Sequence, residues 1–432
     1  MSGEDRHVRS RFTRSARTDD GRTVLFNAYS GAIAVLREGE DTQTGRREAG
    51  FDVPEGTDEP ERARLHHEAL KTSRSRHLVI MPTEACNLRC TYCYQSFSRG
   101  SMARETIESL KACVRRLAPR DDHLAVSWFG GEPLLAYDTI IELSDSFIEA
   151  CESSGIGYTA DMSTNGYLLT PERFAALLER RVSRFMITLD GLDDVHDRRR
   201  KQRAGGQTFE TIARNLLALR ELEADFAIDI RVNFDEDNAE AVPDLLRKLG
   251  EWFGGDARFQ LLVRPVGRWG GPQDERIPVC DRTVADVRMW EMADEGLKQG
   301  LALSETVADI MMPAGAVCYA AKPQSLVIGS DGRLYKCSIA LDDEMNRVGR
   351  LLPGGQLELD EDKIAMWTSG GEEKDAVCQS CFFRPACQGN HCPLYRIRTG
   401  KRPCPHEKRQ IKRVLHLLWK NDQLREERGD GR

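Results

Sequence analysis

Three cysteines stand close together in the segment TEACNLRCTYCYQ, at positions 86, 90 and 93, with no other ligand-like residue beside them. Cysteine thiolates in proteins bind zinc ions and iron–sulfur clusters. A structural zinc ion normally has four protein ligands, whereas a four-iron cluster held by three thiolates keeps one iron open. The spacing of Cys86, Cys90 and Cys93 therefore predicts an iron–sulfur centre with a free coordination position.

A second group of cysteines lies after residue 317. Its members are Cys318, Cys337, Cys378, Cys381, Cys387, Cys392 and Cys404. The segment from Cys318 to Cys337 has the pattern of two strands around the turn GSDG, a hairpin that would bring two thiols together. Seven cysteines are more than the four that a zinc ribbon needs. The odd total of 13 cysteines in a large chain also argues against a disulfide framework.

Length and charge exclude several classes of protein. A chain of 432 residues predicts two or three domains, and its formal charge of −7, with lysines and arginines spread along it, argues against a nucleic-acid binder. No apolar run reaches the roughly eighteen residues of a membrane span, and the N-terminus lacks a secretory signal, so we expect a cytoplasmic protein. The basic start of the chain is expected to be a solvated tail. Its arginines are Arg6, Arg9, Arg11, Arg14 and Arg17.

Between the two cysteine groups, apolar strand-like runs alternate with segments of helical periodicity. The predicted strands are 77–83, 123–131, 158–166, 184–191, 226–234 and 258–266, and the predicted helices are about 103–118, 136–153, 171–181, 208–223, 239–253 and 283–299. Six βα units in series predict a parallel sheet that curls into a partial (β/α)6 barrel. Active sites of such sheets lie at the carboxyl ends of the strands, which is where the first cysteine group falls.

The Cys86-x3-Cys90-x2-Cys93 pattern, with Tyr92 before the last cysteine and a position after the first strand, resembles the signature of the radical S-adenosylmethionine (SAM) enzymes. The resemblance implies a 4Fe–4S cluster whose open iron binds the amino and carboxylate groups of SAM. One electron from the cluster then cleaves the sulfonium to methionine and a 5′-deoxyadenosyl radical, which abstracts hydrogen from a substrate.

Further motifs at the strand ends fit the same resemblance. GGEP at 130–133 resembles the site for the methionine amino group, and STNG at 163–166 resembles the contact with the ribose and carboxylate. The residues expected to bind the cofactor are Tyr92, Gly130, Gly131, Glu132, Ser163, Thr164, Asn165 and Arg231. Asp190, in the stretch DGLDDVHDRRR, is the candidate catalytic residue that positions substrate or accepts a proton, and capping of the following turn is its alternative role.

The second cysteine group resembles the SPASM domain, a C-terminal extension with two auxiliary 4Fe–4S clusters. The resemblance implies three 4Fe–4S clusters in all. It assigns Cys318, Cys337 and Cys392 to the nearer auxiliary cluster. The farther cluster would be held by Cys378, Cys381, Cys387 and Cys404. The nearer cluster is then one ligand short, so either one of its irons is open or a remote residue such as Cys280 closes it. Cys113 and Cys151 fall on predicted helices and are expected to be buried.

These features divide the chain into three predicted domains. Residues 1–75 form an N-terminal module and linker, 76–305 form the radical SAM barrel, and 306–432 form the SPASM domain. Within the first domain, residues 22–40 have the pattern of a hairpin that could hold a peptide along its edge. The expected fold is thus α/β, a partial (β/α)6 TIM-like barrel with a small N-terminal hairpin module and a cysteine-rich C-terminal domain.

The expected function is that of a radical SAM oxidoreductase that modifies a peptide precursor by hydrogen abstraction, forming a crosslink. The expected partners are that peptide and an electron donor such as flavodoxin or ferredoxin, with neither nucleic acid nor membrane. Three alternatives stay open: an anaerobic sulfatase maturase, which oxidises Cys or Ser to formylglycine; a small-molecule radical dehydrogenase or epimerase; and a non-catalytic zinc-rich scaffold.

Overall fold

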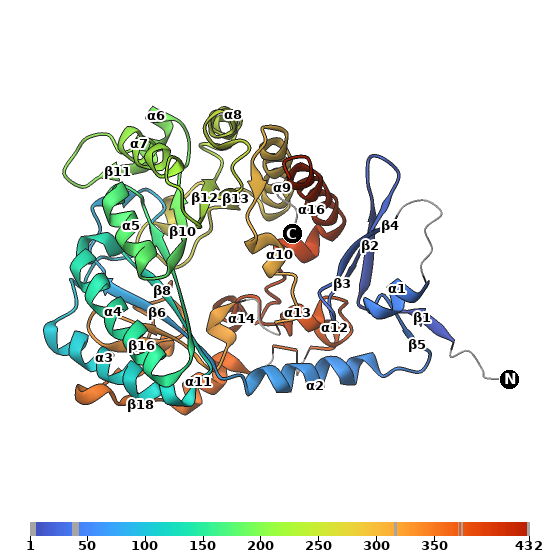
Figure 1. Cartoon of the computed structure of the whole chain (residues 1–432), viewed down its shortest axis with the longest axis horizontal. Coiled ribbons are helices and arrows are strands. Elements are labelled where there is room, and N and C mark those ends of the chain that lie inside the picture. Colours follow the sequence, from blue (N-terminus) through green and yellow to red (C-terminus); the bar gives the residue numbers. More distant parts are fainter. Residues whose placement is uncertain (1–5, 37–42, 315–317, 370, 373–374, 430–432) are drawn as a thin grey trace. The chain divides into compact units, whose positions relative to one another are not determined.

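The computed structural model describes residues 6–36, 43–314, 318–369, 371–372 and 375–429 (Figure 1). The chain forms two compact units. The first combines Met1–Ser73, Leu303–Pro323 and Trp367–Arg432, and the second combines Arg74–Ala302 with Gln324–Met366. The predicted division into domains 1–75, 76–305 and 306–432 stays a prediction. No helix in the described ranges has both the length and the apolar composition needed to cross a bilayer.

The second unit is built on a parallel sheet. Its strands, in spatial as well as sequence order, are β6 Ser75–Thr83, β8 His123–Gly130, β9 Gly157–Thr164, β10 Val182–Thr188, β12 Ala227–Phe234 and β13 Phe259–Pro265. Every neighbouring pair among these strands is parallel. The predicted βα series is therefore confirmed, with strand ends close to the predicted ones.

Helices follow the strands and cover the sheet (Figure 1). They are α3 Arg104–Leu117, α4 Tyr137–Ser154, α5 Pro171–Glu179, α7 Phe209–Arg220, α8 Val242–Phe253 and α9 Arg282–Lys298. Their buried residues lie three and four positions apart, as Ile140, Leu143 and Phe147 do on α4. Phe147 stacks on Trp128 of β8 with ring centroids 6.3 Å apart. Cys113 and Cys151 are buried on α3 and α4, as expected.

The cysteine hairpin extends this same sheet. β15 Ser325–Ile328 pairs in parallel with β6 and antiparallel with β16 Arg333–Tyr335, and β17 Arg347–Leu351 and β18 Leu357–Leu359 continue the antiparallel part. The predicted hairpin around GSDG is confirmed, with Gly332 at φ +76° where a side chain would be strained. Cys337 follows the hairpin in the second unit, whereas Cys318 belongs to the first.

Further short strands and helices occur in the two units. They are β1 His7–Arg9, β5 Asp52–Pro54, β7 Leu88–Cys90, β11 Arg200–Gln202, β14 Ala302–Leu303, α1 Gln43–Glu48, α6 Asp193–Arg199, α10 Thr306–Asp309, α11 Glu361–Thr368, α12 Ala376–Gln379, α13 Arg384–Cys387, α14 Pro393–Thr399 and α15 His406–Arg409.

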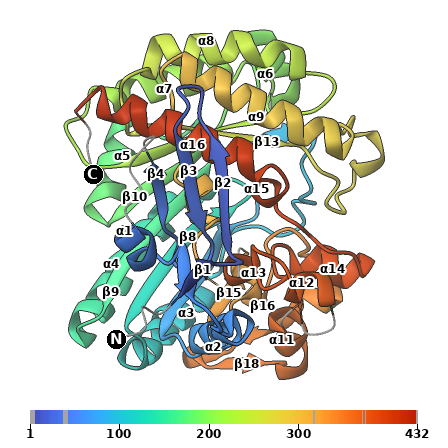
Figure 2. The ribbon, with the colours of Figure 1, turned by 90° about the vertical axis from the view of Figure 1, so that its right-hand side faces the viewer.

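The first unit contains a three-stranded antiparallel sheet of β2 Thr13–Arg17, β3 Thr23–Asn27 and β4 Ile33–Leu36, packed on the C-terminal helix α16 Ile411–Glu426 (Figure 2). The β3–β4 pairing confirms the predicted N-terminal hairpin, although residues 37–40 of the predicted range lie outside the described residues. The prediction of a solvated basic tail is wrong for residues 7–17. Phe12 and Ala16, two buried apolar residues among the arginines, anchor this segment to the unit.

A helix that follows the N-terminal sheet contacts the cysteine-rich segment. This helix, α2 Glu59–Lys71, begins at Asp58, whose carboxylate accepts a 3.0 Å hydrogen bond from the Glu61 amide. At its start, the carbonyl of Pro60 accepts a 3.2 Å hydrogen bond from Arg384 of α13. The N-terminal segment and the last cysteines thus share one unit.

A row of polar side chains crosses the parallel sheet of the second unit. His77 and Ser127 lie 2.8 Å apart (Nε2 to Oγ), and the Ser127 hydroxyl donates a 2.7 Å hydrogen bond to Asp161. Farther along the row, Arg184 donates to Asp229 at 3.1 Å. Burial raises the pKa of Asp161 to about 6, and Asp229 adds to the shift, while Ser127 and Arg184 oppose it.

We expect this raised pKa to make stability depend on pH. An acid whose pKa is higher in the folded state stabilises the fold while it is protonated, and that contribution is lost as the pH rises from about 4 through about 6. Asp161→Asn should therefore gain about 2 kcal/mol of unfolding free energy relative to the wild type between about pH 4 and pH 7. Urea titrations of the cluster-free protein measure this. The exposed control Asp225→Asn should show no such trend, and an equal trend in both variants would contradict the assignment.

Candidate functional site

The first cysteine group lies in the loop after β6, held there by a small two-stranded sheet. β7 pairs antiparallel with β11, so that Cys90 stands opposite Arg200. Two further backbone bonds flank the pairing, from Thr91 to the Arg199 carbonyl at 2.8 Å and from Arg203 to the Asn87 carbonyl at 2.8 Å. Sequence reasoning missed both strands because segments of three residues carry no periodic signal.

Arg200 is the central side chain beside this loop. It is 7 % exposed, and its guanidinium donates a 2.8 Å hydrogen bond to the Tyr92 hydroxyl. The Tyr92 hydroxyl in turn donates to the carboxylate of Asp190, which lies 4.0 Å from Arg200. Burial opposes the charge of Arg200, but Cys90, Tyr92 and Asp190 together raise its pKa well above the usual value. The sequence analysis did not single out Arg200, although it ends the stretch DGLDDVHDRRR.

Asp190 is fully buried at the end of β10. Besides the Tyr92 hydroxyl, its carboxylate accepts a 3.1 Å hydrogen bond from the Asn233 amide, and its carbonyl accepts one of 2.7 Å from Asn238. These contacts make Asp190 the counter-charge of Arg200 and fix the position of Tyr92. A catalytic role for Asp190 stays a prediction.

The neighbouring histidine and aspartate of the same stretch have structural contacts. The pKa of His196 is held well below its usual value by burial and by Arg200 and Arg199, so this ring is neutral. The Asp197 carboxylate accepts hydrogen bonds of 2.8 and 2.9 Å from the amides of Thr208 and Phe209 at the start of α7. Neither side chain is a candidate for catalysis.

Glu132 links the ends of two strands. Its buried carboxylate accepts hydrogen bonds from the Thr164 hydroxyl and the Asn165 amide at 2.8 Å, and from the Leu134 amide at 3.0 Å. Burial raises the pKa of Glu132, and these hydrogen bonds oppose the rise. Asn165 also donates a 2.8 Å bond to Asn87, the residue after Cys86. The predicted cofactor contacts at the ends of β8 and β9 are therefore tied directly to the cysteine loop.

Gly130 and Gly131 have a steric reason to be glycines. Gly130 has φ +135°, and a Cβ there would stand 2.2 Å from the Thr83 carbonyl oxygen. A Cβ on Gly131 would stand 2.3 Å from the Ala85 carbonyl oxygen. Both glycines let the backbone that leads into the cysteine loop lie directly against the end of β8.

The other two predicted cofactor residues lie on neighbouring strands. Ser163 precedes Thr164 on β9 and is half-buried. Arg231 is on β12, where its guanidinium donates a 2.8 Å hydrogen bond to the side chain of Asn233. Burial, together with the nearby Arg264, lowers the pKa of Arg231. All the predicted residues of the first site thus come from the loop after β6 or from β8, β9, β10 and β12, at or near their carboxyl ends.

The donor set of this site fits an iron–sulfur cluster. Burial raises the pKa of Cys86 to about 12 and that of Cys90 to about 11, so these thiols need a strong cationic centre to ionise. Among the described residues, no three acidic, histidine or cysteine side chains converge on a single metal ion. The side-chain nitrogens Nδ2 of Asn87 and Nε of Arg200 are buried without a partner.

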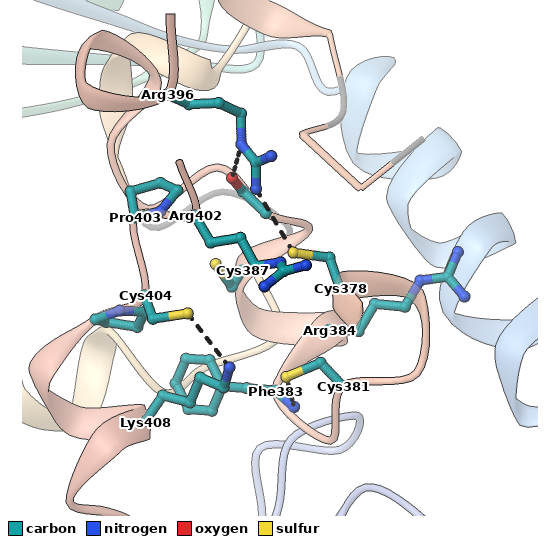
Figure 3. A pocket seen from close by; sticks show the side chains of 12 residues that line it. Cys378, Cys381, Phe383, Arg384, Cys387, Arg396, Arg402, Pro403, Cys404 and Lys408 are labelled. Carbon is teal, nitrogen blue, oxygen red and sulfur yellow. Dashed lines mark hydrogen bonds between the residues drawn. The ribbon is translucent and has the colours of Figure 1, made fainter. Parts of the chain in front are cut away.

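Four cysteines of the second group line one hollow in the first unit (Figure 3). They are Cys378, Cys381, Cys387 and Cys404, the set assigned to the farther auxiliary cluster. Cys387 is buried, which raises its pKa to about 12, and the other three are half-buried. Four thiols around one hollow fit a closed four-thiolate cluster.

Cationic side chains reach these thiols directly. Arg396 lies 3.5 Å from the Cys378 sulfur, and Lys408 lies 3.4 Å from the Cys404 sulfur (Figure 3). Burial opposes the charge of Lys408, but Cys381 and Cys404 raise its pKa above the usual value. Burial and Asp375 raise the pKa of Cys378, and the contact with Arg396 opposes that rise. Of the remaining predicted ligands, Cys318 and Cys392 belong to the first unit and Cys337 to the second, so their common cluster stays a prediction.

The hydroxyl of Tyr92 should be worth more to stability than an ordinary tyrosine hydroxyl. Tyr92→Phe leaves Arg200 and Asp190 without their shared partner in a buried site, and we expect it to cost about 2 kcal/mol of unfolding free energy in the cluster-free protein. The control is Tyr167→Phe, whose hydroxyl accepts a 3.1 Å hydrogen bond from the half-buried Gln202. Urea titrations with equal losses for both variants would show that the network around Arg200 is unimportant.

Comparison with known proteins identifies the barrel. The profile of the Radical SAM superfamily matches residues 80–249. A cysteine-type anaerobic sulfatase-maturating enzyme of Clostridium perfringens (strain 13 / Type A) is 24 % identical over 333 residues, which cover 72 % of this chain and 87 % of the relative. An AdoMet-dependent heme synthase of Nitratidesulfovibrio vulgaris is 28 % identical over 204 residues, 46 % of this chain and 51 % of the relative.

Solved structures share the fold. Native anSMEcpe with bound AdoMet and Kp18Cys peptide has a TM-score of 0.60 and 17 % identity, covering 82 % of this chain and 99 % of its own. Streptococcus suis SuiB bound to the precursor peptide SuiA has a TM-score of 0.52 and 16 % identity, covering 91 % of this chain and 97 % of its own. With the profile match, the parallel sheet and the cysteine loop at its carboxyl edge, we conclude that residues 80–249 of this chain form a radical SAM domain.

Proposed function

We propose that this radical SAM enzyme acts on a peptide precursor and forms a crosslink in it by hydrogen abstraction. The observation that carries the proposal is the likeness to SuiB bound to its precursor peptide, which covers 91 % of this chain and thus reaches well beyond the barrel. The small N-terminal sheet supports it, because β4 is an edge strand of that sheet and an extended peptide can add to such an edge.

The first site supplies the reactive group in this proposal. Cys86, Cys90 and Cys93 hold the catalytic cluster, and Arg200 places a positive charge beside Cys90. When bound, the cluster and SAM supply a 5′-deoxyadenosyl radical that takes a hydrogen atom from the substrate. Glu132, fixed by Thr164 and Asn165, presents a buried carboxylate for the amino group of SAM.

Two auxiliary clusters complete the proposed cofactor set. Cys378, Cys381, Cys387 and Cys404 hold the farther cluster, and Cys318, Cys337 and Cys392 hold the nearer one. Cys280 is half-buried, just before Asp281, the residue that caps α9, and we propose that it is not a ligand. The nearer cluster then keeps one open iron that can bind the peptide.

The second candidate is formylglycine formation, because the sulfatase-maturating relative aligns with 72 % of this chain. Incubation with candidate peptides, SAM and a reductant distinguishes the two reactions by mass spectrometry. A crosslink removes two hydrogens and resists aldehyde reagents, whereas formylglycine reacts with them and, when made from cysteine, has lost its sulfur. Turnover of a small molecule alone would support a dehydrogenase or epimerase, and a colourless zinc protein would support a scaffold.

Replacing the first three cysteines should separate the clusters. We expect about twelve irons per chain after anaerobic reconstitution, and the triple variant with Ala at 86, 90 and 93 should lose about four of them. It should also form no 5′-deoxyadenosine, which chromatography measures. Cys280→Ala is the matched control and should keep its full iron content. Residual 5′-deoxyadenosine from the triple variant would show that the catalytic cluster lies elsewhere.

Lys408 should set the reduction potential of the farther cluster. A cation within hydrogen-bond distance of a ligand sulfur stabilises the reduced, more negative cluster. Lys408→Met should therefore shift the midpoint potential of the farther cluster to a more negative value. Lys408→Arg keeps the positive charge and should leave that potential close to the wild-type value. EPR-monitored redox titration measures this, with Lys412→Met, exposed on α16, as the control. Identical potentials in the two Met variants would contradict the role of Lys408.

A further inference from the structure

A row of arginines from the start of the chain borders the four-cysteine hollow on its Cys381 side. Arg11 donates a 3.3 Å hydrogen bond to the carbonyl of Ser380. Arg14 stands over the ring of Phe382, 4.1 Å from its centroid, close enough to a Cys381 thiolate and to Arg9 for both charges to act on it. Arg9 and Arg11 are exposed.

A second group of cations borders the hollow on its Cys404 side. Lys408 is half-buried and contacts the Cys404 sulfur, and Arg402 is exposed at the edge of the same hollow. Together the two groups form what we call the basic rim, defined as Arg9, Arg11, Arg14, Arg402 and Lys408. The rim thus combines residues from the two ends of the chain within one compact unit.

The carboxylates beside the hollow do not cancel the rim. Asp375 pairs with Arg402 at 2.7 Å and with Arg396 at 3.6 Å, so it is shared between two cations. Glu372 is buried and pairs with Arg384 at 2.6 Å. The rim is therefore a positively charged patch on a chain whose formal charge is −7. Such a local reversal of sign attracts a partner of the opposite charge.

Exposed apolar side chains accompany the charges. Val377, next to Cys378, is 51 % exposed, and Val8, next to Arg9, is 38 % exposed. Charged residues around a few apolar contacts are suited to a transient protein–protein complex, in which charge sets the rate of encounter.

We propose that the basic rim is the docking surface for a small acidic one-electron carrier protein, which exchanges electrons with the cluster held by Cys378, Cys381, Cys387 and Cys404. This inference rests on the proposed function, because it requires a cluster at these four cysteines. One electron passes between the carrier and the cluster, so that one is oxidised as the other is reduced, and no bond or proton is transferred.

The position of the rim favours a redox protein over other acidic partners. Three of the four thiols are half-buried rather than deeply enclosed, so a docked carrier comes close to the sulfurs. An acidic peptide or a nucleic acid would gain nothing from a redox centre at the middle of its binding surface. The rim therefore has a use specific to electron transfer.

The experiment uses the full reconstituted chain and a purified acidic flavodoxin. Affinity is measured by calorimetry over a series of salt concentrations, and electron transfer by anaerobic stopped-flow mixing. We expect the wild-type affinity to fall steeply with salt, and the Arg9→Glu/Arg11→Glu variant to bind about tenfold more weakly at low salt with a similar loss of electron-transfer rate. The matched control, Arg115→Glu/Arg120→Glu, makes the same charge change at two exposed arginines of the barrel unit and should stay within about twofold of wild type.

The outcomes separate the docking surface from the proposed function. Iron content and the visible spectrum are measured first, and absence of the cluster from wild-type protein would overturn both proposals. If the cluster is present but both double variants behave alike, the docking surface is wrong and the proposed function stands. The docking proposal would also be overturned if the affinity of the wild-type protein for flavodoxin did not depend on salt. Two results together would also overturn the docking proposal. They are polyglutamate binding to the rim as tightly as flavodoxin does, and electron transfer by the rim variant at the wild-type rate.

Discussion

The buried guanidinium of Arg200 is the interaction on which the first site depends. A cation removed from water is tolerable only with close counter-charges and hydrogen bonds, and Arg200 has Tyr92 and Asp190 on one side and Cys90 on the other. The same residue pairs with the cysteine loop through β7 and β11. One charged side chain thereby ties the loop after β6 to the ends of β10 and β12.

The sequence could predict the barrel and the place of the site, because both rest on local signals. Repeating apolar runs marked the strands, and the rule that sites lie at carboxyl ends placed Cys86, Glu132, Asn165 and Asp190 together. The contacts that hold the site could not be predicted from the sequence. Arg200 pairs with a strand of three residues, and the glycines of GGEP are dictated by carbonyls of a different segment, Thr83 and Ala85. Such contacts depend on tertiary structure alone.

The N-terminal arginines show how composition can mislead. Five arginines in the first 17 positions are typical of a solvated tail. Phe12 and Ala16 stand among these arginines and are buried, which a count of charges does not reveal. Because β2 pairs with β3 and packs on α16, the arginines between these apolar residues are held at fixed positions. Their neighbours, residues 380 to 382, are more than 360 positions away in sequence. A charge run becomes a structured surface once a few apolar residues anchor it.

The two thiol sites differ in the charged side chains around them, and this difference would give clusters bound there different reduction potentials. At the first, Asp190 lies 4.0 Å from Arg200 and the carboxylate of Glu132 acts on Cys86, so carboxylates oppose the positive charge beside the thiols. At the second, Arg396 and Lys408 reach the sulfurs, and Asp375 is shared between two arginines. Net charge and hydrogen bonds to sulfur set the reduction potential of an iron–sulfur cluster. In the proposed enzyme, a cluster at the second site would therefore hold an electron more readily than one at the first site. The same ligand type would then give two different reduction potentials, because the fold places different charges around the two sets of thiols.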